Sequence, residues 1–301
     1  MTSETRTEGS GRATGEEPSR VLIAGCGYVG TALGELLVGH GHKVWGLRRS
    51  LLEASPSIRP IEADLAIASS LENLPKNLDF VFYTAAAGGF EDGLYKSVYV
   101  DGLLNLLGAL EQGGHRPRRV FFTSSTSIYA QSDGGWVDEE SPTEPDAFSG
   151  TRMLEAERLL LAGPFPATAV RLAGIYGPRR TRLIDTVRSG RAVYREEPPH
   201  YTNRIHRDDC AGVLHHLMGL PQPDPIVLAV DSEPASQRTV MEWLAAALGA
   251  PDPRPAKPTD APPRRGRSNK RCSNARLLAS GYALRYPTFR DGYTPMIRAL
   301  T

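Results

Sequence analysis

Short, uninterrupted runs of hydrophobic residues recur through the first half of the chain. Such runs are typical of strands that are buried on both faces of a parallel sheet. They predict five strands, at residues 21–24, 43–47, 79–83, 119–123 and 167–171. Hydrophobic residues at helical spacing lie between several of them, and predict helices at residues 28–38, 94–110 and 150–161. Strands that alternate with helices predict an α/β fold, a Rossmann-type doubly wound parallel sheet with right-handed crossovers.

The pattern loosens after residue 172. Residues 174–204 are interpreted as loop and short helix, and the later elements are a helix at 206–220, a strand at 226–230 and a helix at 236–248. A last short helix is predicted at 273–278, with Ser273 as its N-cap. Residues 173–301 are therefore expected to form mainly a small C-terminal substrate lobe, interleaved with the last elements of the Rossmann domain at residues 20–172. The polar residues 1–19 are expected to be a disordered tail.

Residues 251–267 are rich in proline and arginine and are interpreted as an exposed loop or linker. The basic residues in and after this stretch are Arg264, Arg265, Arg267, Lys270 and Arg271. We favour the interpretation that they are solvated. The alternative is that they form an anion clamp at the mouth of the active site.

Composition removes several classes of function. Lys and Arg together number 35 and Asp and Glu 34, so the net charge of +1 does not favour binding to nucleic acid or to an anionic membrane. No apolar run is long enough for a transmembrane helix. The three cysteines are far apart, which predicts neither a disulfide framework nor a metal site. A cytoplasmic location is expected.

Three glycines, Gly25, Gly27 and Gly30, form a G-x-G-x-x-G motif directly after the first strand and at the start of the first helix. The first glycine permits a tight turn, the second lets the backbone approach a pyrophosphate, and the third lets the helix pack on the strand. The helix N-terminus then faces the phosphates, with Tyr28 and Val29 in its first turn. The motif predicts that the chain binds a nicotinamide dinucleotide.

The end of the second strand suggests which dinucleotide is bound. NAD-binding domains usually carry an acid about 20 residues after the glycines, where it holds the ribose 2′-hydroxyl. Here Arg48 and Arg49 occupy that place. Because arginine pairs with a 2′-phosphate, NADP(H) is favoured, with NAD as the alternative.

Five further segments resemble the extended short-chain dehydrogenase/reductases, the NAD-dependent epimerase/dehydratase family. They are Ala63-Asp64-Leu65, Thr84-Ala85-Ala86-Ala87, the stretch from Ser124 to Ala130, the stretch from Arg171 to Pro178, and Ile205 to Asp209. The resemblance implies that Asp64 and Leu65 lie beside the adenine, that Thr84, Ala85 and Ala86 follow the fourth strand at the cofactor, and that Ser125 is the family's catalytic serine. Asn203 to His206 and the tail from Asn269 onward resemble an atypical bacterial, YeeZ-like branch.

At the expected positions of the catalytic pair, this sequence differs from the family it resembles. Family members use a tyrosine and a lysine four residues later as the acid/base pair, but here Ser149 and Met153 stand at these positions. Serine is a poor proton donor at neutral pH and methionine carries no charge. Of the usual set only Ser125 remains, and His206 and Tyr129 are the other candidates for catalysis. Tyr176 could also face the cleft.

Two functions follow from these observations. The first is an NADP(H)-dependent oxidoreductase or epimerase/dehydratase-like enzyme that acts on a small polar or anionic substrate. The alternative is a non-catalytic NADP(H) sensor that regulates a partner. The partner expected for the enzyme is a small-molecule substrate, with no nucleic acid and no membrane, and a homodimer is possible.

Overall fold

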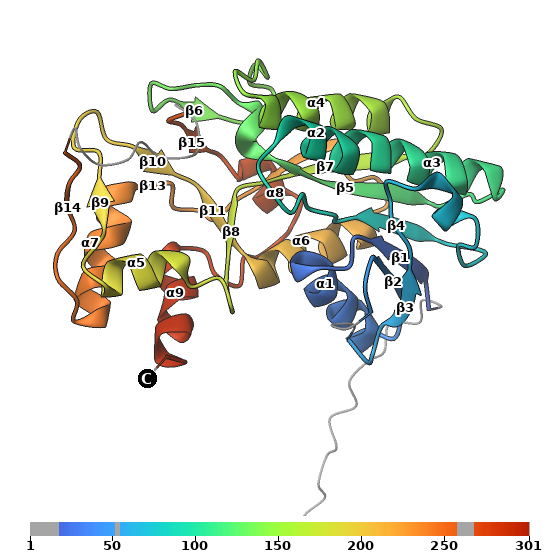
Figure 1. Ribbon diagram of the computed structural model, residues 1–301, viewed down its shortest axis with the longest axis horizontal. Coiled ribbons are helices and arrows are strands. Elements are labelled where there is room, and N and C mark those ends of the chain that lie inside the picture. The colour runs from blue at the N-terminus through green and yellow to red at the C-terminus, as the bar shows by residue number, and fades with distance from the viewer. Residues whose placement is uncertain (1–17, 52–54, 258–267, 301) are drawn as a thin grey trace, which may run out of the picture.

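A seven-stranded parallel sheet lies at the centre of this computed structural model, which describes residues 18–51, 55–257 and 268–300 (Figure 1). The strands, in their order across the sheet, are β12 (Ile226–Ala229), β7 (Ala167–Leu172), β5 (Arg119–Ser125), β4 (Phe80–Tyr83), β1 (Arg20–Ala24), β2 (Lys43–Arg48) and β3 (Arg59–Glu62). The chain order reverses between β1 and β4, and ligands of such sheets bind at this switch point, beyond the carboxyl ends of the strands. The predicted α/β Rossmann-type fold is confirmed.

Helices cover both faces of the sheet (Figure 1). On one face, α1 (Tyr28–Gly39) packs against α6 (Arg207–Gly219) and buries Leu33, Leu37 and Leu214 against the strands. On the other face, α3 (Gly102–Gln112) and α4 (Phe148–Leu161) bury Leu106 and Leu160. This double cover explains why the strands have uninterrupted hydrophobic runs.

The helix predicted at residues 94–110 is not regular. It consists of α2 (Asp92–Tyr95), a π-helical turn, η2 (Lys96–Asp101), and then α3. The hydroxyl of the buried Tyr83 donates a hydrogen bond to the carbonyl of Val98, inside this turn. A side chain that engages the backbone in this way widens a helix locally, and such π-turns are frequent at functional sites.

A second group of helices forms the C-terminal lobe. Its helices are α5 (Arg182–Arg188), α7 (Gln237–Leu248) and α9 (Phe289–Arg298), which enclose a separate core around Ile184, Leu244 and Phe289. Helix α9 was not predicted, although Thr288 and Asp291 form a capping box at its start. The predicted N-cap Ser273 lies one residue too early, because α8 (Ala275–Ala279) begins after Asn274.

Short elements complete the described chain. Four two-stranded pairs form within residues 136–272, and several of their strands lie in the stretch 174–204, which was predicted as loop and short helix. The pairs are β6 (Trp136–Val137) with β15 (Arg271–Cys272), β8 (Gly174–Tyr176) with β11 (Arg204–His206), β9 (Val193–Tyr194) with β14 (Arg254–Pro255), and β10 (Tyr201–Thr202) with β13 (Ala235–Ser236). The 3-10 helices are η1 (Ala68–Leu71) and η3 (Thr126–Ile128).

The interpretation of the basic stretch as a solvated linker is wrong at its end. Lys270 is only 4% exposed, and Arg271 pairs with Trp136 in the β15–β6 ladder. The backbone is held there because Asn269 Oδ1 accepts a hydrogen bond from the N–H of Tyr201. Residues 258–267, which include Arg264, Arg265 and Arg267, lie outside the described residues.

The predicted N-terminal tail falls mostly outside the described residues, which begin at Pro18. At its end, the backbone N–H of Ser19 donates a hydrogen bond to Nδ1 of His42. Within the described ranges, no helix has the length and apolar character needed to cross a membrane. Cys26, Cys210 and Cys272 are all buried and carry free thiols.

Candidate functional site

A cavity of about 1320 Å³ opens at the carboxyl ends of the central strands. Its walls include the residues that follow β1, β2, β4, β5 and β7, and part of the C-terminal lobe closes one side. The cavity therefore lies where the topology predicts a ligand, between the Rossmann domain and the lobe.

Gly25 and Gly27 line this cavity, and the three motif glycines have three different environments. Gly25 has a positive φ of +83°, and a Cβ there would lie 2.3 Å from Cα of Ala85. At Gly30 a Cβ would lie 2.5 Å from Oγ1 of Thr84, whereas at Gly27 it would meet nothing closer than 3.8 Å. The first and third glycines are needed for close packing, and the second leaves open space at the start of α1. This arrangement fits a bound pyrophosphate.

The loop after β4 supports the glycine turn. Thr84 is buried, and its Oγ1 donates a hydrogen bond of 2.9 Å to the carbonyl of Gly25. Ala85 and Ala86 follow it along the cavity wall. Thr84 therefore acts through the backbone of the glycine loop, and the alanines leave room for a ligand.

Residues predicted to hold the adenosine end line the cavity together. Arg48 is half-buried and Arg49 is exposed at the end of β2. Asp64 and Leu65 lie on the neighbouring loop, where Oδ1 of Asp64 accepts a hydrogen bond of 3.0 Å from the N–H of Ala66. The structure thus brings the two arginines and the Ala63–Leu65 segment to the same end of the cavity.

A further arginine, which the sequence analysis did not single out, lies over the start of α1. The guanidinium of Arg180 stacks 4.1 Å from the ring centroid of Tyr28, whose hydroxyl donates to the carbonyl of Pro178. Arg180 and Tyr28 both line the cavity, as does Val29. The two consecutive arginines after Pro178 were the available sequence signal.

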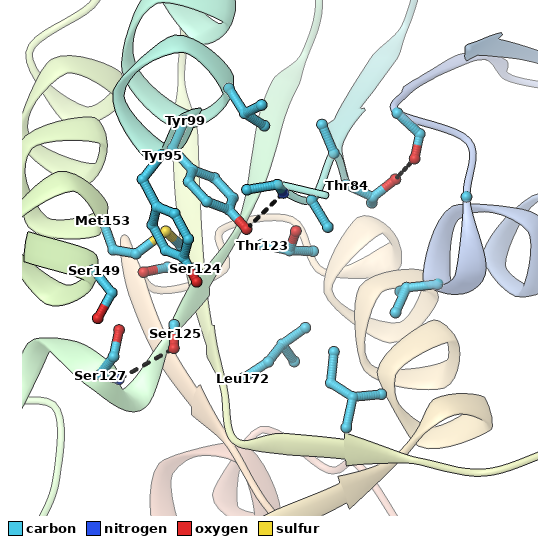
Figure 2. Close-up of a pocket in the computed structure, with 18 of the residues that line it drawn as sticks. Thr84, Tyr95, Tyr99, Thr123, Ser124, Ser125, Ser127, Ser149, Met153 and Leu172 are labelled. Carbon is cyan, nitrogen blue, oxygen red and sulfur yellow. Dashed lines mark hydrogen bonds between the residues drawn. The ribbon is translucent and has the colours of Figure 1, made fainter. Parts of the chain in front are cut away.

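Ser125 ends β5 and faces the middle of the cavity (Figure 2). Its Oγ accepts a hydrogen bond of 3.1 Å from the N–H of Ser127, which leaves the hydroxyl proton available to a ligand. Ser149 and Met153 approach the same region from α4 (Figure 2). Ser149 and Met153, which the resemblance predicts at the positions of the family's tyrosine and lysine, therefore line the cavity, and they offer an alcohol and a thioether.

A buried network of charged and polar side chains joins the end of β5 to β7 and α4. Arg171 and Glu157 are 2% and 1% exposed, and their Nη2 and Oε2 atoms are 2.8 Å apart. Ser124 donates a hydrogen bond to Oε1 of Glu157. The network holds β5 and α4 together directly beside Ser125.

Tyr129 belongs to this network, and the prediction that it contributes to catalysis is not supported by its position. Its hydroxyl donates to the carbonyl of Asp138 and accepts a hydrogen bond of 2.7 Å from Arg171. Burial raises the pKa of Tyr129. The proton is therefore committed to the backbone and is held more tightly than in a free phenol.

His206 is likewise occupied structurally. The ring is 2% exposed and does not line the cavity, and its Nδ1 accepts a hydrogen bond from the N–H of Asp208 as the N-cap of α6. Burial lowers the pKa of His206 to about 4. Tyr176, which packs against it, lies outside the cavity as well.

Two further side chains line the cavity: Tyr95, which was not predicted as a site residue, and Lys270, which belongs to the alternative interpretation of the basic stretch as an anion clamp at the mouth of the active site. Tyr95 reaches into it from α2, and its ring lies beside Tyr99 (Figure 2). Lys270 reaches it from the end of the basic stretch, and its Nζ donates 2.9 Å to the carbonyl of Tyr129. Burial lowers the pKa of Lys270, because the buried ammonium group loses hydration. Among the described residues, no group of three or more His, Cys, Asp or Glu could hold a metal ion.

The family model described as the NAD dependent epimerase/dehydratase family matches residues 21–201, which include the glycine loop and Ser125. The chain belongs to this family.

Relatives of known sequence and structure agree with the assignment. Protein YeeZ of Escherichia coli K12 is 28% identical over 217 residues, which cover 67% of this chain and 74% of YeeZ. A bovine sterol-4-alpha-carboxylate 3-dehydrogenase (decarboxylating) is 27% identical over 54% of this chain, which spans about half of the dehydrogenase (48%). A solved structure from Methylobacillus flagellatus, described by the same family name, is 37% identical, covers 94% of this chain and 99% of its own, and has a TM-score of 0.79.

More distant members share the fold. The UDP-glucose 4-epimerase of Thermus thermophilus, solved as a complex with NAD, has a TM-score of 0.76 at 20% identity and covers 93% of this chain and 98% of its own. As a member of the epimerase/dehydratase family, the chain is a Rossmann-type protein from a family of NAD-dependent enzymes. Its similarity to YeeZ agrees with the resemblance seen in the sequence.

Proposed function

We propose that this family member is an NADP(H)-dependent oxidoreductase or epimerase/dehydratase-like enzyme for a small, polar, negatively charged substrate. One observation carries the proposal: a single cavity connects the glycine loop, Ser125 and the buried Lys270. A cofactor at the glycine loop and a substrate against the lobe would therefore meet beside Ser125.

The preference for NADP rests on Arg48 and Arg49. Both line the cavity at the end of β2, where an NAD-specific domain usually places an acid. A 2′-phosphate at this place would accept charge-assisted hydrogen bonds from a guanidinium. Arg180, over the ring of Tyr28, adds positive charge near the start of α1.

The preference for an anionic substrate rests on Lys270. Its ammonium group is buried at the lobe side of the cavity, and Asp146 is the carboxylate whose charge acts on it. A carboxylate or phosphate on the substrate would supply the missing counter-charge. Nearby His200 has a buried Nδ1 without a hydrogen-bond partner in the structure, so this wall also offers an unsatisfied polar atom.

The nicotinamide would supply or accept a hydride when the cofactor is bound. Ser125 would donate its free hydroxyl proton in a hydrogen bond to the substrate oxygen and so orient it. Lys270 would fix the charged end of the substrate, and the Glu157–Arg171 pair would keep β5 in place beneath the reacting oxygen. Neither Ser149 nor Met153 can supply the proton that the family's tyrosine supplies.

Calorimetry tests the proposed preference for NADPH over NADH. Wild-type protein should bind NADPH more tightly than NADH, and Arg48→Asp should weaken NADPH binding by about tenfold to a hundredfold, since a charge-assisted hydrogen bond contributes about 1.5–3 kcal/mol. Arg191→Asp is the matched control, because Arg191 is an exposed lobe arginine that does not line the cavity. Equal wild-type affinities for the two cofactors would refute the NADP preference.

A turnover screen tests whether the protein is an enzyme and whether Ser125 and Lys270 contribute to its activity. Sugar nucleotides and small ketones, in charged and uncharged forms, are tested with NADPH on wild type, Ser125→Ala and Lys270→Gln. Turnover of charged compounds that falls in both variants is the expected result. Tight NADPH binding with no turnover on any compound would instead favour the sensor, for which the loss of the Tyr–Lys pair is the supporting observation.

A further inference from the structure

The part of the cavity in front of Ser125 receives a phenol from a helix other than α4. Tyr95 ends α2, and its hydroxyl points toward Ser125 and the end of β5, on the side where Ser149 and Met153 also lie (Figure 2). We infer that Tyr95 is the proton donor and acceptor of this site and takes the place of the tyrosine that Ser149 replaces. The inference rests on the proposed function.

Three aromatic rings fix the orientation of Tyr95. Its ring centroid lies 5.7 Å from that of Phe90 and 5.3 Å from that of Phe148, with both pairs close to perpendicular, and 5.1 Å from that of Tyr99. Phe148 is the first residue of α4, so the cluster joins the two helices next to Ser149. The phenol is thus held by packing, as a group that transfers a proton must be.

An ion pair fastens α2 to α4. Arg152 on α4 binds Asp92 on α2 in a bidentate manner, with Nε–Oδ1 and Nη2–Oδ2 distances of 2.7 and 2.9 Å. Its Nη1 also contacts Glu155 at 2.9 Å. The π-helical turn η2 begins immediately after Tyr95. These features set the end of α2 over the cavity.

The hydroxyl of Tyr95 differs from those of its neighbours. Tyr99 accepts a hydrogen bond from the N–H of Ala87, Tyr129 donates to Asp138, and Tyr28 donates to Pro178. The Tyr95 hydroxyl forms no hydrogen bond to any residue in the described part of the chain, and the residue is only half-buried. It is therefore available to a substrate oxygen.

The proton transfer balances with the hydride transfer. In reduction, the bound nicotinamide would supply the hydride to the carbonyl carbon of the substrate, and the π electrons of the C=O bond would move to oxygen. Tyr95 gives its hydroxyl proton to that oxygen, while Ser125 donates a hydrogen bond to it. The phenolate then regains a proton from water, and alcohol oxidation runs through the same steps in reverse. A phenol, with a typical pKa of about 10, performs this role far better than the alcohol of Ser149.

The test measures the ionisation of Tyr95 and needs no known substrate. Calorimetry first identifies the oxidised dinucleotide that binds more tightly. At about pH 9, its addition to wild type should increase the tyrosinate absorbance, with a rise of roughly tenfold in the ionised fraction of one tyrosine, because a cation within about 4–6 Å favours a phenolate. The corresponding ADP-ribose compound, which lacks the nicotinamide cation, should not produce this increase.

Two matched variants assign the signal. Tyr95→Phe keeps the ring and its packing and should abolish the increase, whereas Tyr99→Phe, which changes a neighbouring ring of the same cluster, should retain it. With a substrate from the turnover screen, Tyr95→Phe should also lower kcat by about 10²–10⁴-fold.

An increase that persists in Tyr95→Phe, or that is absent from wild type although the dinucleotide binds, would overturn the inference and leave the proposed function standing. Failure of both dinucleotides to bind would overturn the proposed function and this inference with it.

Discussion

Gly27→Val separates cofactor binding from folding. A Cβ at Gly27 would approach no atom more closely than 3.8 Å and would meet only ordinary contacts, so the fold should tolerate the substitution. The added carbons would instead fill the space at the first turn of α1, where the backbone N–H groups lack partners within the helix. A phosphate displaced from two of these groups loses two charge-assisted hydrogen bonds, about 3–6 kcal/mol in total, which corresponds to at least about a hundredfold in affinity.

Gly30→Ala is the matched variant with the opposite expectation. Its Cβ would lie 2.5 Å from Oγ1 of Thr84 and 2.9 Å from Cγ2 of Ile23, and overpacking of this kind costs about 1–3 kcal/mol of stability. Calorimetry with NADPH measures binding, and urea denaturation followed by circular dichroism measures the free energy of unfolding. The reasoning fails if Gly27→Val binds NADPH as wild type does, or if it loses as much stability as Gly30→Ala.

Two predictions concern buried charges. Glu157→Gln leaves Arg171 without its counter-charge and should lower the free energy of unfolding, measured by urea denaturation, by about 3–5 kcal/mol. The control Glu155→Gln removes a more exposed ion pair and should lower the free energy of unfolding by less than about 1 kcal/mol. Similar effects of the two substitutions would contradict the role of the network. Burial raises the pKa of Asp231 to about 7, so the folded state retains a proton that an unfolded aspartate releases near pH 4. The free energy of unfolding should therefore fall as the pH rises from about 4 to 7, and urea denaturation across this range should show that Asp231→Asn removes this decrease. An unchanged pH dependence in the variant would refute the assignment.

The sheet was predicted well from the sequence, because a strand that is buried on both faces has an uninterrupted run of hydrophobic residues. The runs at residues 21–24 and 167–171 became β1 and β7 with shifts of a single residue at one end. Edge strand β3 carries only a weak trace, since three of its four residues are polar or proline and exposed. Helix α9 was missed because Gly292 and Pro295 interrupt its pattern, although its capping box could have been recognised.

The glycine loop could be recognised from the sequence, because one continuous segment carries its three glycines. The opposite wall of the cavity could not, because it depends on contacts between distant segments. Tyr95 looks like an ordinary helical residue until α2 is placed against α4, and Lys270 looks like part of a solvated basic stretch until β15 pairs with β6. His206 and Tyr129 lie in matching motifs, yet their polar atoms are used by the backbone around them.

The β15–β6 pair has a consequence for the construction of chimeras between this chain and its relatives. Ser268 and Lys270 line the cavity wall, and in this segment Asn203 Oδ1 accepts a hydrogen bond from the N–H of Cys272 while its Nδ2 donates one to the carbonyl of Lys270. Asn269 likewise binds the carbonyl of Pro199. A chimera with a relative that is joined at a single crossover near residue 200 would therefore mismatch these contacts within one wall. Exchange of this wall requires segments 199–203 and 268–272 to be transplanted together, from the same parent.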